Sequence, residues 1–414
     1  MKKLLALLML CCVLACTVMA VGAVSEASVW GDLSGDDVVG TKDLLLLRQH
    51  IAGIGALEDV QRGDLNYDGD VNMKDVLMLR LFVAGLIDIP TTTLPTTEKP
   101  TMPTATGSSN DVYRYDETGE PIMTFLDGVD DCSLGVWWWQ TDDGQNETRR
   151  EKYLDFLEKN GTTEIYYYCV YDMVNSYGRQ MTYEFVLAAK EHGISVVPLY
   201  DDVGMINGVE RCDVPVSKMI SMFEAYNETY PDAPLSMIHF DVEPHQVFED
   251  KNIKHLTEKE LSLYANNFIG GIQALRKAGI KVEAALNCTW NNYGGENVEW
   301  DGVKGIYNIC AKGLDSMCMM AYRDTAADIL ELGKPGFDAA MEYGTRISYG
   351  IETGEYPQFN QTYEEFGQES KEYMYTEFAK VFESLRSNHP AGGYGLAVHN
   401  HRTWMSMKND ADFT

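Results

Sequence analysis

The 414-residue sequence has few basic side chains for its length. It holds 33 Lys and Arg residues against 63 Asp and Glu residues, so its formal net charge is −30 at pH 7. A surface of that sign repels the phosphate backbones of DNA and RNA, which argues against nucleic acid as a partner. The charge suits an extracellular protein, a cation-binding protein or a protein that recognises neutral polymers.

The signature motifs of several other classes are also missing. No Gly-x-Ser-x-Gly elbow and no His-Glu-x-x-His pair occurs, which argues against a serine esterase and a zinc peptidase. A glycine-rich dinucleotide turn and the paired cysteines of a structural zinc site are absent too. With 45% apolar residues, the chain is nevertheless predicted to fold around a large core.

Long apolar runs are confined to the N-terminus. Residues 1–28, "MKKLLALLMLCCVLACTVMAVGAVSEAS", place Lys2 and Lys3 before a short apolar stretch that gives way to small residues. This pattern predicts an export signal and a secreted, extracellular protein without a stable transmembrane segment. A second interpretation ends "VLAC" at Cys16, a lipid-attachment site that would make the protein a lipoprotein.

Six cysteines follow the predicted signal. Three of them, Cys169, Cys288 and Cys318, lie inside apolar strand-like runs, where a free and buried thiol is expected. The even number in an exported chain also permits disulfides, so the disulfide state stays open. The other three are Cys132, Cys212 and Cys310.

Two segments near the N-terminus repeat each other: "GDLSGDDVVGTKDLLLLRQHIAG" at 31–53 and "GDLNYDGDVNMKDVLMLRLFVAG" at 63–85. Each carries oxygen donors at the spacing of a twelve-residue calcium loop, including a backbone carbonyl at the seventh position. The sequence therefore predicts two Ca²⁺ ions. The predicted ligands are Asp32, Ser34, Asp36, Val38 and Asp43 in the first loop, and Asp64, Asn66, Asp68, Asp70 and Asp75 in the second.

Each calcium loop runs into an apolar helix, expected at 41–52 and 73–84, and no helix precedes the loop. This duplicated loop–helix unit resembles a type I dockerin, which we place at residues 29–90. The resemblance implies a small all-α module that binds a cohesin of a scaffoldin protein. It also implies that the rest of the chain is its cargo, usually an enzyme for plant cell-wall polysaccharide.

A Thr- and Pro-rich stretch at 91–110 is predicted to be an extended linker, because its composition cannot build a core. Residues 111–414 then alternate strand-like runs with amphipathic helical stretches. Eight such strands predict an α/β fold, a closed (β/α)8 TIM barrel, with an open doubly wound sheet as the alternative. The predicted strands are 134–139, 164–170, 195–201, 236–243, 281–288, 316–322, 346–352 and 393–400.

Acidic residues end the fourth predicted strand, "SMIHFDVE". Because side chains alternate along a strand, His239, Asp241 and Glu243 are expected to share the inward face. Two carboxyl groups in one cleft can hold different protonation states, which glycoside hydrolysis requires of its acid and its anion. The alternative is a buried ion pair with Arg323 or with His239.

The run "HFDVEPH" resembles the DxDxE strand of glycoside hydrolase family 18, and "MMAYRD" resembles that family's Met-x-Tyr-Asp segment. The resemblance implies that Glu243 is the general acid, that Asp241 orients the substrate's N-acetyl group, and that Tyr322 bonds the acetamido oxygen. The sequence departs from the family pattern at Ser236, His239 and Arg323.

Glu352 supports a second chemistry. Its strand should point it into the barrel, where it could act as nucleophile opposite Glu243 in a retaining glycosidase. The alternative for Glu352 is a hydrogen bond to substrate, or an ion pair with Arg346 or Arg323. Polar and aromatic residues at or near other strand ends complete the predicted substrate site: Trp138, Asp201, His239, Asn287, Trp290, Arg323 and His399.

Taken together, these patterns predict a secreted, cellulosome-associated glycoside hydrolase that cuts O-glycosidic bonds of a polysaccharide or glycan. No cofactor is expected in the barrel. The alternative is a non-catalytic barrel that binds glycan or protein and is carried on the scaffold. The sugar, the linkage, the stereochemical course and the choice of cohesin stay open.

Overall fold

The computed structural model describes residues 31–35, 38–51, 57, 60–63, 65, 71, 73–83, 112–248, 256–354 and 366–413. The chain divides into two compact units, 1–108 and 109–414. The predicted signal (1–28) and linker (91–110) lie outside the described residues. Within the described ranges, no helix combines the length and apolar character needed to cross a bilayer.

The first unit is built from the two repeats. Helix α2 (Thr41–Ile51) follows the first loop, and a 3-10 turn, η1 (Val60–Gly63), precedes the second. Helix α3 (Met73–Val83) follows the second loop. Leu47 of α2, Leu65, and Val76 and Leu79 of α3 are almost fully buried in one small core. Each repeat alone would leave its apolar face exposed, so the pair is the folding unit.

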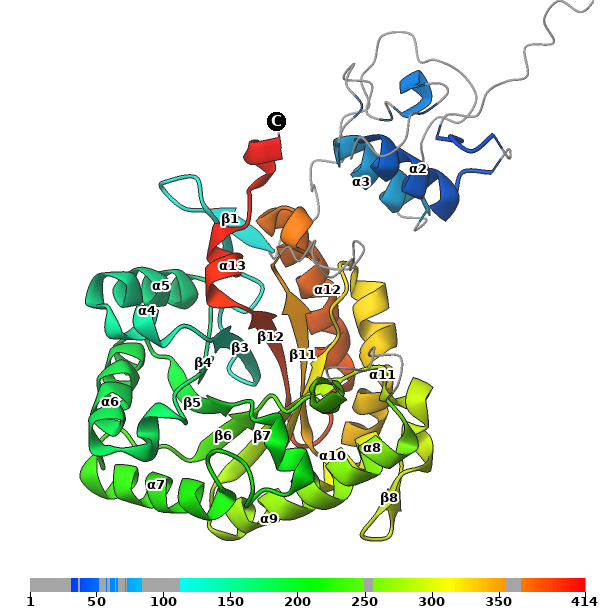
Figure 1. The fold of residues 1–414 in the computed structure, drawn as a ribbon. Helices are drawn as coiled ribbons and strands as arrows, with labels where there is room; N and C mark the ends of the chain where they lie inside the picture. Colours follow the sequence, from blue (N-terminus) through cyan, green and yellow to red (C-terminus); the bar gives the residue numbers. More distant parts are fainter. Residues whose placement is uncertain are drawn as a thin grey trace, which may run out of the picture. The chain divides into compact units, whose positions relative to one another are not determined.

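The second unit is a closed barrel of eight parallel strands, as the sequence predicted (Figure 1). Neighbours in space are also successive strands of the barrel in the chain, and the last strand closes the barrel on the first. The strands are β3 (Cys132–Trp138), β4 (Glu164–Tyr167), β5 (Ser195–Tyr200), β6 (Met237–Phe240), β7 (Lys281–Asn287), β10 (Ser316–Met320), β11 (Arg346–Glu352) and β12 (Tyr394–His399).

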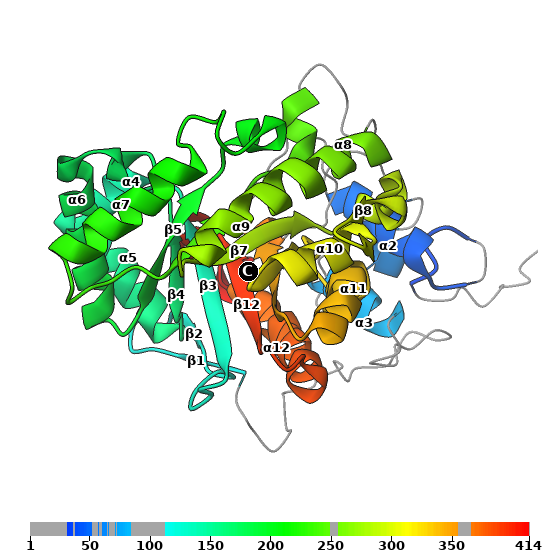
Figure 2. The same cartoon turned by 90° about the horizontal axis from the view of Figure 1, so that it is seen from below.

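Amphipathic helices form an outer ring around the strands (Figures 1 and 2). Their apolar faces bury against the outward side chains of the strands. Gly344 (φ 68°) follows α11 in the left-handed conformation shortly before β11, and glycine adopts this conformation without strain. The main helices are α5 (Glu147–Lys159), α6 (Ser176–Glu191), α7 (Val216–Thr229), α8 (Glu258–Leu263), α9 (Gly270–Lys277), α10 (Ile306–Gly313), α11 (Ala326–Tyr343), α12 (Lys371–Asn388) and α13 (His401–Ser406).

Shorter elements complete the unit. A π-helical stretch, η6 (Tyr264–Ile269), joins α8 to α9. Two antiparallel hairpins lie outside the barrel sheet. The remaining elements are β1 (Tyr113–Tyr115), β2 (Pro121–Met123), β8 (Glu299–Trp300), β9 (Val303–Lys304), α4 (Thr141–Gln145), η2 (Asp172–Val174), η3 (Val203–Asn207), η4 (Pro244–Phe248), η7 (Trp290–Tyr293), η8 (Gly295–Asn297), η10 (Phe366–Gln368) and η11 (Asp410–Phe413).

Alternation along the strands divides the core into two layers. Inward side chains, among them Trp137, Tyr166, Leu199 and Cys318, form a compact cluster inside the barrel. Outward side chains pack beneath the helices in a larger cluster. All six cysteines of the second unit are buried and carry free thiols, which answers the open disulfide question in favour of the reduced form.

Candidate active site

The two acids of the fourth barrel strand lie just beyond the end of β6. This strand spans Met237–Phe240 and is shorter than the predicted 236–243. The backbone N–H of Asp241 still donates to the carbonyl of Tyr200, at 2.9 Å, which extends the pairing with β5 by one residue. Pro244 then begins the 3-10 turn η4, and a proline has no N–H to continue a sheet. The carboxyl end of β6 therefore presents both acids at the mouth of the barrel.

Asp241 is the more enclosed of the two acids. Its Oδ1 atom is buried and has no hydrogen-bond partner within the described part of the chain. Burial, reinforced by the neighbouring charge of Glu243, raises the pKa of Asp241 to about 8. Asp241 therefore carries a proton at neutral pH.

Glu243 is the more accessible acid, with a side chain that is 20% exposed. It accepts a hydrogen bond from Nε2 of Gln246 at 2.6 Å, and Nε2 of His245 lies 3.7 Å from its Oε2. Both partners come from η4, directly after the acid. Glu243 is thus the carboxyl group that a ligand in the mouth would meet first.

A hydrogen-bonded chain crosses the opposite side of the mouth. Oε2 of Glu352 lies 2.6 Å from Nδ1 of His399, and Oε1 of Glu352 accepts from the backbone N–H of Gly354 at 2.6 Å. The indole N–H of Trp139 donates to Nε2 of His399 at 2.7 Å. Burial opposes a charge on His399, but the bond to Glu352 outweighs it and raises the pKa of His399. Glu352 therefore pairs with His399, and not with Arg346 or Arg323 as its alternative role supposed.

Tyr322, at the end of the sixth strand of the barrel, lies among these groups. Its ring centroid is 6.2 Å from that of His399. Burial, followed by the charges of Glu352 and Asp241, raises the pKa of Tyr322 well above its usual range. The predicted catalytic residues Asp241, Glu243, Tyr322 and Glu352 consequently act on one another electrostatically within a single cluster.

Three further predicted residues lie at strand ends with local partners. Asp201 receives the hydroxyl of Tyr171 at 3.5 Å, and burial raises the pKa of Asp201. Oδ1 of Asn287 accepts from the backbone and the hydroxyl of Thr289, so it stabilises the turn after β7. Arg323 donates to the carbonyl of Tyr322 at 2.7 Å.

Trp138 and Trp290 are not at the mouth, contrary to the sequence prediction. Trp138 points outward and stacks on His401 with the ring centroids 4.0 Å apart. Because alternate residues of β3 face inward, Trp137 and Trp139 occupy the barrel side and Trp138 the helix side. Trp290 is 1% exposed and packs on Tyr264 in the outer core, because the chain after β7 folds into the turn η7.

His239 points inward as expected but lies below the mouth, where it is fully buried. Its Nδ1 is 2.8 Å from Oε1 of Glu283, its register partner on β7, and its ring stacks on Tyr166 at 3.9 Å. A role in contacting substrate is therefore wrong for His239. His239 belongs instead to a buried charged cluster with Glu283, Arg346 and Glu164, which we call the base of the barrel.

Arg346 closes that base. Its guanidinium bonds Glu164 at 2.5 Å and Glu283 at 3.2 Å, from two other strands of the barrel. Burial opposes the charge of Glu283, but the bond from His239 and the charge of Arg346 hold its pKa at about 2. Glu283 is thus ionised throughout the neutral range.

Sequence reasoning missed two tyrosines, Tyr168 and Tyr171, that form an aromatic wall of the mouth together with Trp139. The rings of Trp139 and Tyr168 lie 5.3 Å apart, and Tyr168 and Tyr171 lie 5.6 Å apart. Tyr168 follows β4 directly and continues the inward face that Tyr166 begins. The alternation of side chains within "YYY" could have identified Tyr168.

The structure describes some of the predicted calcium ligands of the two loops. The buried carboxylates of Asp32 and Asp43 converge on one turn: Oδ1 of Asp43 accepts from the N–H groups of Leu33 and Ser34, and Oδ1 of Asp32 accepts from that of Gly35. In the second repeat, Oδ1 of Asp75 accepts from Leu65 N at 2.7 Å, which matches the Asp43–Leu33 contact at 2.9 Å. Val38 is 64% exposed. The predicted ligands Asp36, Asp64, Asn66, Asp68 and Asp70 lie outside the described residues.

The paired arrangement fits hard oxygen ligation, because the first and last ligands of loop one meet at the same turn. When bound, Ca²⁺ would neutralise carboxylates that this turn holds close together. Elsewhere, the described residues include one group able to share a metal ion, Asp155, Glu158 and His192, on the outer helices and away from the mouth.

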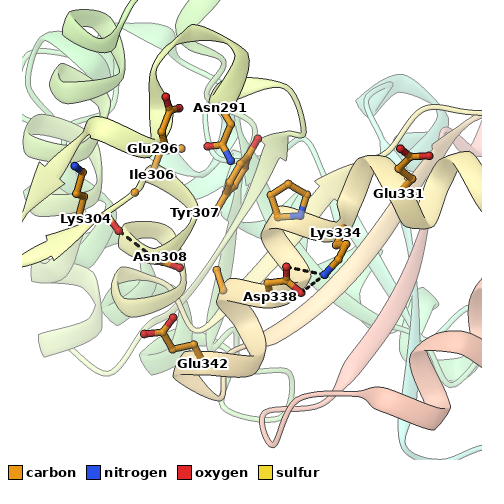
Figure 3. A pocket seen from close by; sticks show the side chains of 13 residues that line it. Asn291, Glu296, Lys304, Ile306, Tyr307, Asn308, Glu331, Lys334, Asp338 and Glu342 are labelled. Carbon is orange, nitrogen blue, oxygen red and sulfur yellow. Dashed lines mark hydrogen bonds and ion pairs between the residues drawn. The ribbon is translucent and has the colours of Figure 1, made fainter.

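The outer wall also contains a hollow of about 710 Å³ between α10 and α11 (Figure 3). Its lining mixes Glu331 and Glu342 with Lys304, and Lys334 pairs with Asp338 at 2.6 Å across one helical turn. These charged side chains are exposed. The hollow is formed by the helices, whereas the acids described above lie at the strand ends.

Residues 30–83 match the family model described as the dockerin type I domain. Residues 30–83 therefore form a type I dockerin, in agreement with the paired loop–helix repeats and their common core. The match covers the first unit alone. No curated protein matches the sequence.

Among solved structures, the barrel is similar to the endo-beta-1,4-mannanase from Thermotoga petrophila, at 12% identity and a TM-score of 0.39, over 66% of this chain and 68% of that one. It is also similar to the GH39 enzyme from Xanthomonas axonopodis pv. citri, at 11% and 0.40, over 65% and 58%. D-Psicose 3-epimerase from Clostridium cellulolyticum H10 matches at 10% and 0.36, over 62% and 99%. These similarities carry no argument about the reaction.

Proposed function

We propose that the protein is an extracellular glycoside hydrolase that is docked to a cohesin through its calcium-loaded dockerin. The observation that carries the proposal is the pair Asp241 and Glu243 at the mouth: Oδ1 of Asp241 is buried, and burial raises the pKa of this acid to about 8, whereas the side chain of Glu243 is open to a ligand. Cleavage of a glycosidic bond needs a proton for the leaving oxygen and a negative charge near the developing positive ring.

We assign the general acid role to Glu243, because its side chain is the accessible member of the pair. Asp241, which holds the proton of the pair, would pass it to Glu243 for transfer to the leaving oxygen, and would then carry the negative charge near the positive ring. Glu352 would act as a positioning residue, because its two oxygens are already bonded to Gly354 and His399. Tyr322, Asp201, Asn287, Arg323 and His399 would contact the substrate around this pair.

A non-catalytic glycan-binding barrel is the alternative. The contact between Glu352 and His399 favours this alternative, because a retaining mechanism needs a second carboxylate that is free to attack. In that case the aromatic wall and the acids would bind sugar without cleaving it.

The test incubates the full chain with a panel of neutral polysaccharides and oligosaccharides, and compares wild type with Glu243→Gln. We expect hydrolysis by wild type and a loss of about 10²–10⁴-fold in Glu243→Gln, with binding retained. Glu331→Gln, an exposed glutamate on α11, is the matched control and should keep full activity. Equal activity of Glu243→Gln and wild type would refute the acid assignment, and binding without product in both would support the alternative.

A further inference from the structure

The segment between β4 and α6 carries tyrosines that the proposed catalytic pair does not use. Tyr168 and Tyr171 are half-buried and continue the aromatic wall away from Trp139. Tyr171 also touches Tyr200, with the ring centroids 4.9 Å apart, and its hydroxyl reaches Asp201. Because this segment follows the carboxyl end of β4, it lies on the mouth side of the barrel.

Tyr177 extends this segment onto open surface. It is 70% exposed, and nearby Val174 is 40% exposed. Tyr177 lies in the first turn of α6, next to Gly178. The backbone of Gly178 packs so closely on Asp172, the residue after Tyr171, that a Cβ would lie 1.8 Å from the Asp172 carbonyl oxygen.

Other contacts fix the same turn. The side chain of Asn175 accepts from the N–H of Gly178 at 3.0 Å, and Arg179 donates to the carbonyl of Met173 at 3.0 Å. Tyr177 is thus an exposed aromatic ring whose backbone is held in place by the packing of its neighbour Gly178 on Asp172. Such pre-ordering lowers the entropy lost when a ligand binds.

We propose that Tyr168, Tyr171 and Tyr177 form an extension of the glycan site beyond the mouth, so that the preferred ligand is a chain of neutral sugars longer than the mouth itself. This inference rests on the proposed function. Sugar rings present apolar C–H faces that pack on tyrosine, while the tyrosine hydroxyl stays in water. Asp172 and Asp201 beside the segment, on a chain of net charge −30, disfavour an anionic polymer.

The test uses the full chain and β-1,4-linked gluco-, manno-, xylo- and N-acetylglucosamine oligosaccharides, each as disaccharide and hexasaccharide. Calorimetry gives the Kd of each for wild type, Tyr177→Ala and Tyr177→Trp. For the sugar that binds, we expect Tyr177→Ala to weaken the hexasaccharide about three- to tenfold and to leave the disaccharide unchanged. Tyr177→Trp should restore hexasaccharide affinity.

Tyr343→Ala is the matched control, because Tyr343 is 37% exposed at the end of α11, just before β11, and so lies at the opposite end of the barrel. The extension is refuted if Tyr177→Ala and wild type bind the hexasaccharide equally, even where hydrolysis proceeds. Failure of wild type to bind any probe overturns the proposed function together with the extension. Loss of cohesin binding in Tyr177→Ala would assign the surface to a protein partner and overturn it as well.

Discussion

The indole N–H of Trp139 donates to Nε2 of His399, and Nδ1 of the His399 imidazole lies 2.6 Å from Oε2 of Glu352. This arrangement matches the neutral tautomer in which Nδ1 carries the proton. The Glu352 carboxylate favours protonation of His399, whereas the indole donor opposes it, because a proton on Nε2 would face the indole N–H. The charge of the imidazole is therefore set by two neighbours with opposite effects.

Substitution of Trp139 by Phe should raise the pKa of His399. The phenyl ring keeps the aromatic wall but removes the donor that opposes protonation of Nε2. NMR titration of the imidazole measures the shift, with Trp300→Phe on the outer hairpin as the control. An unchanged titration of His399 would show that the indole does not restrain its charge.

Asp241→Asn should stabilise the barrel increasingly between pH 4 and pH 8. The folded-state pKa of Asp241 is raised from 3.8 to about 8, so in this interval the unfolded chain has released a proton that the folded chain still binds. Wild-type stability therefore falls by up to about 1.4 kcal/mol for each pH unit, and the variant lacks that loss. Melting temperatures of both proteins across this range measure it, and parallel curves would contradict the burial of the carboxyl group.

Glu283→Gln should destabilise the barrel by about 3–5 kcal/mol, because it leaves the buried charge of Arg346 with one carboxylate fewer. Denaturant unfolding of the full chain measures the loss. Asp338→Asn is the control: its partner Lys334 is exposed, so the change should stay within about 0.5 kcal/mol. Equal effects of the two substitutions would contradict the structural role of the base.

Calcium binding should fall from two ions to one in Asp43→Ala and, separately, in Asp75→Ala. Each residue is the last predicted ligand of its own loop, and the two make equivalent backbone contacts to Leu33 and Leu65. Isothermal titration of the chelator-treated full chain counts the ions. Two ions in either variant would show that these carboxylates are structural. Chelation of both ions should also abolish cohesin binding.

Local sequence patterns were sufficient to predict the barrel. Strand-like runs that alternate with amphipathic helical stretches indicated the eight strands and the helices between them. Alternation also indicated the inward face of His239. Its depth was not predictable, because that depends on its register partner Glu283, which is distant in sequence. The prediction for Trp138 was wrong for a related reason: in a run of three tryptophans, a register error of one residue exchanges the inward and outward faces of the strand.

Arg346 and its two carboxylates also constrain the path of a ligand. The ion pairs of Arg346 with Glu164 and Glu283 block the barrel at the amino ends of its strands. A ligand that enters from the carboxyl ends must therefore leave by the same route. Under the proposed function, a polymeric substrate could not pass through the barrel, and it would lie across the rim with only a short portion bound near Asp241. The enzyme would then be able to cleave inside a long sugar chain without binding a free chain end.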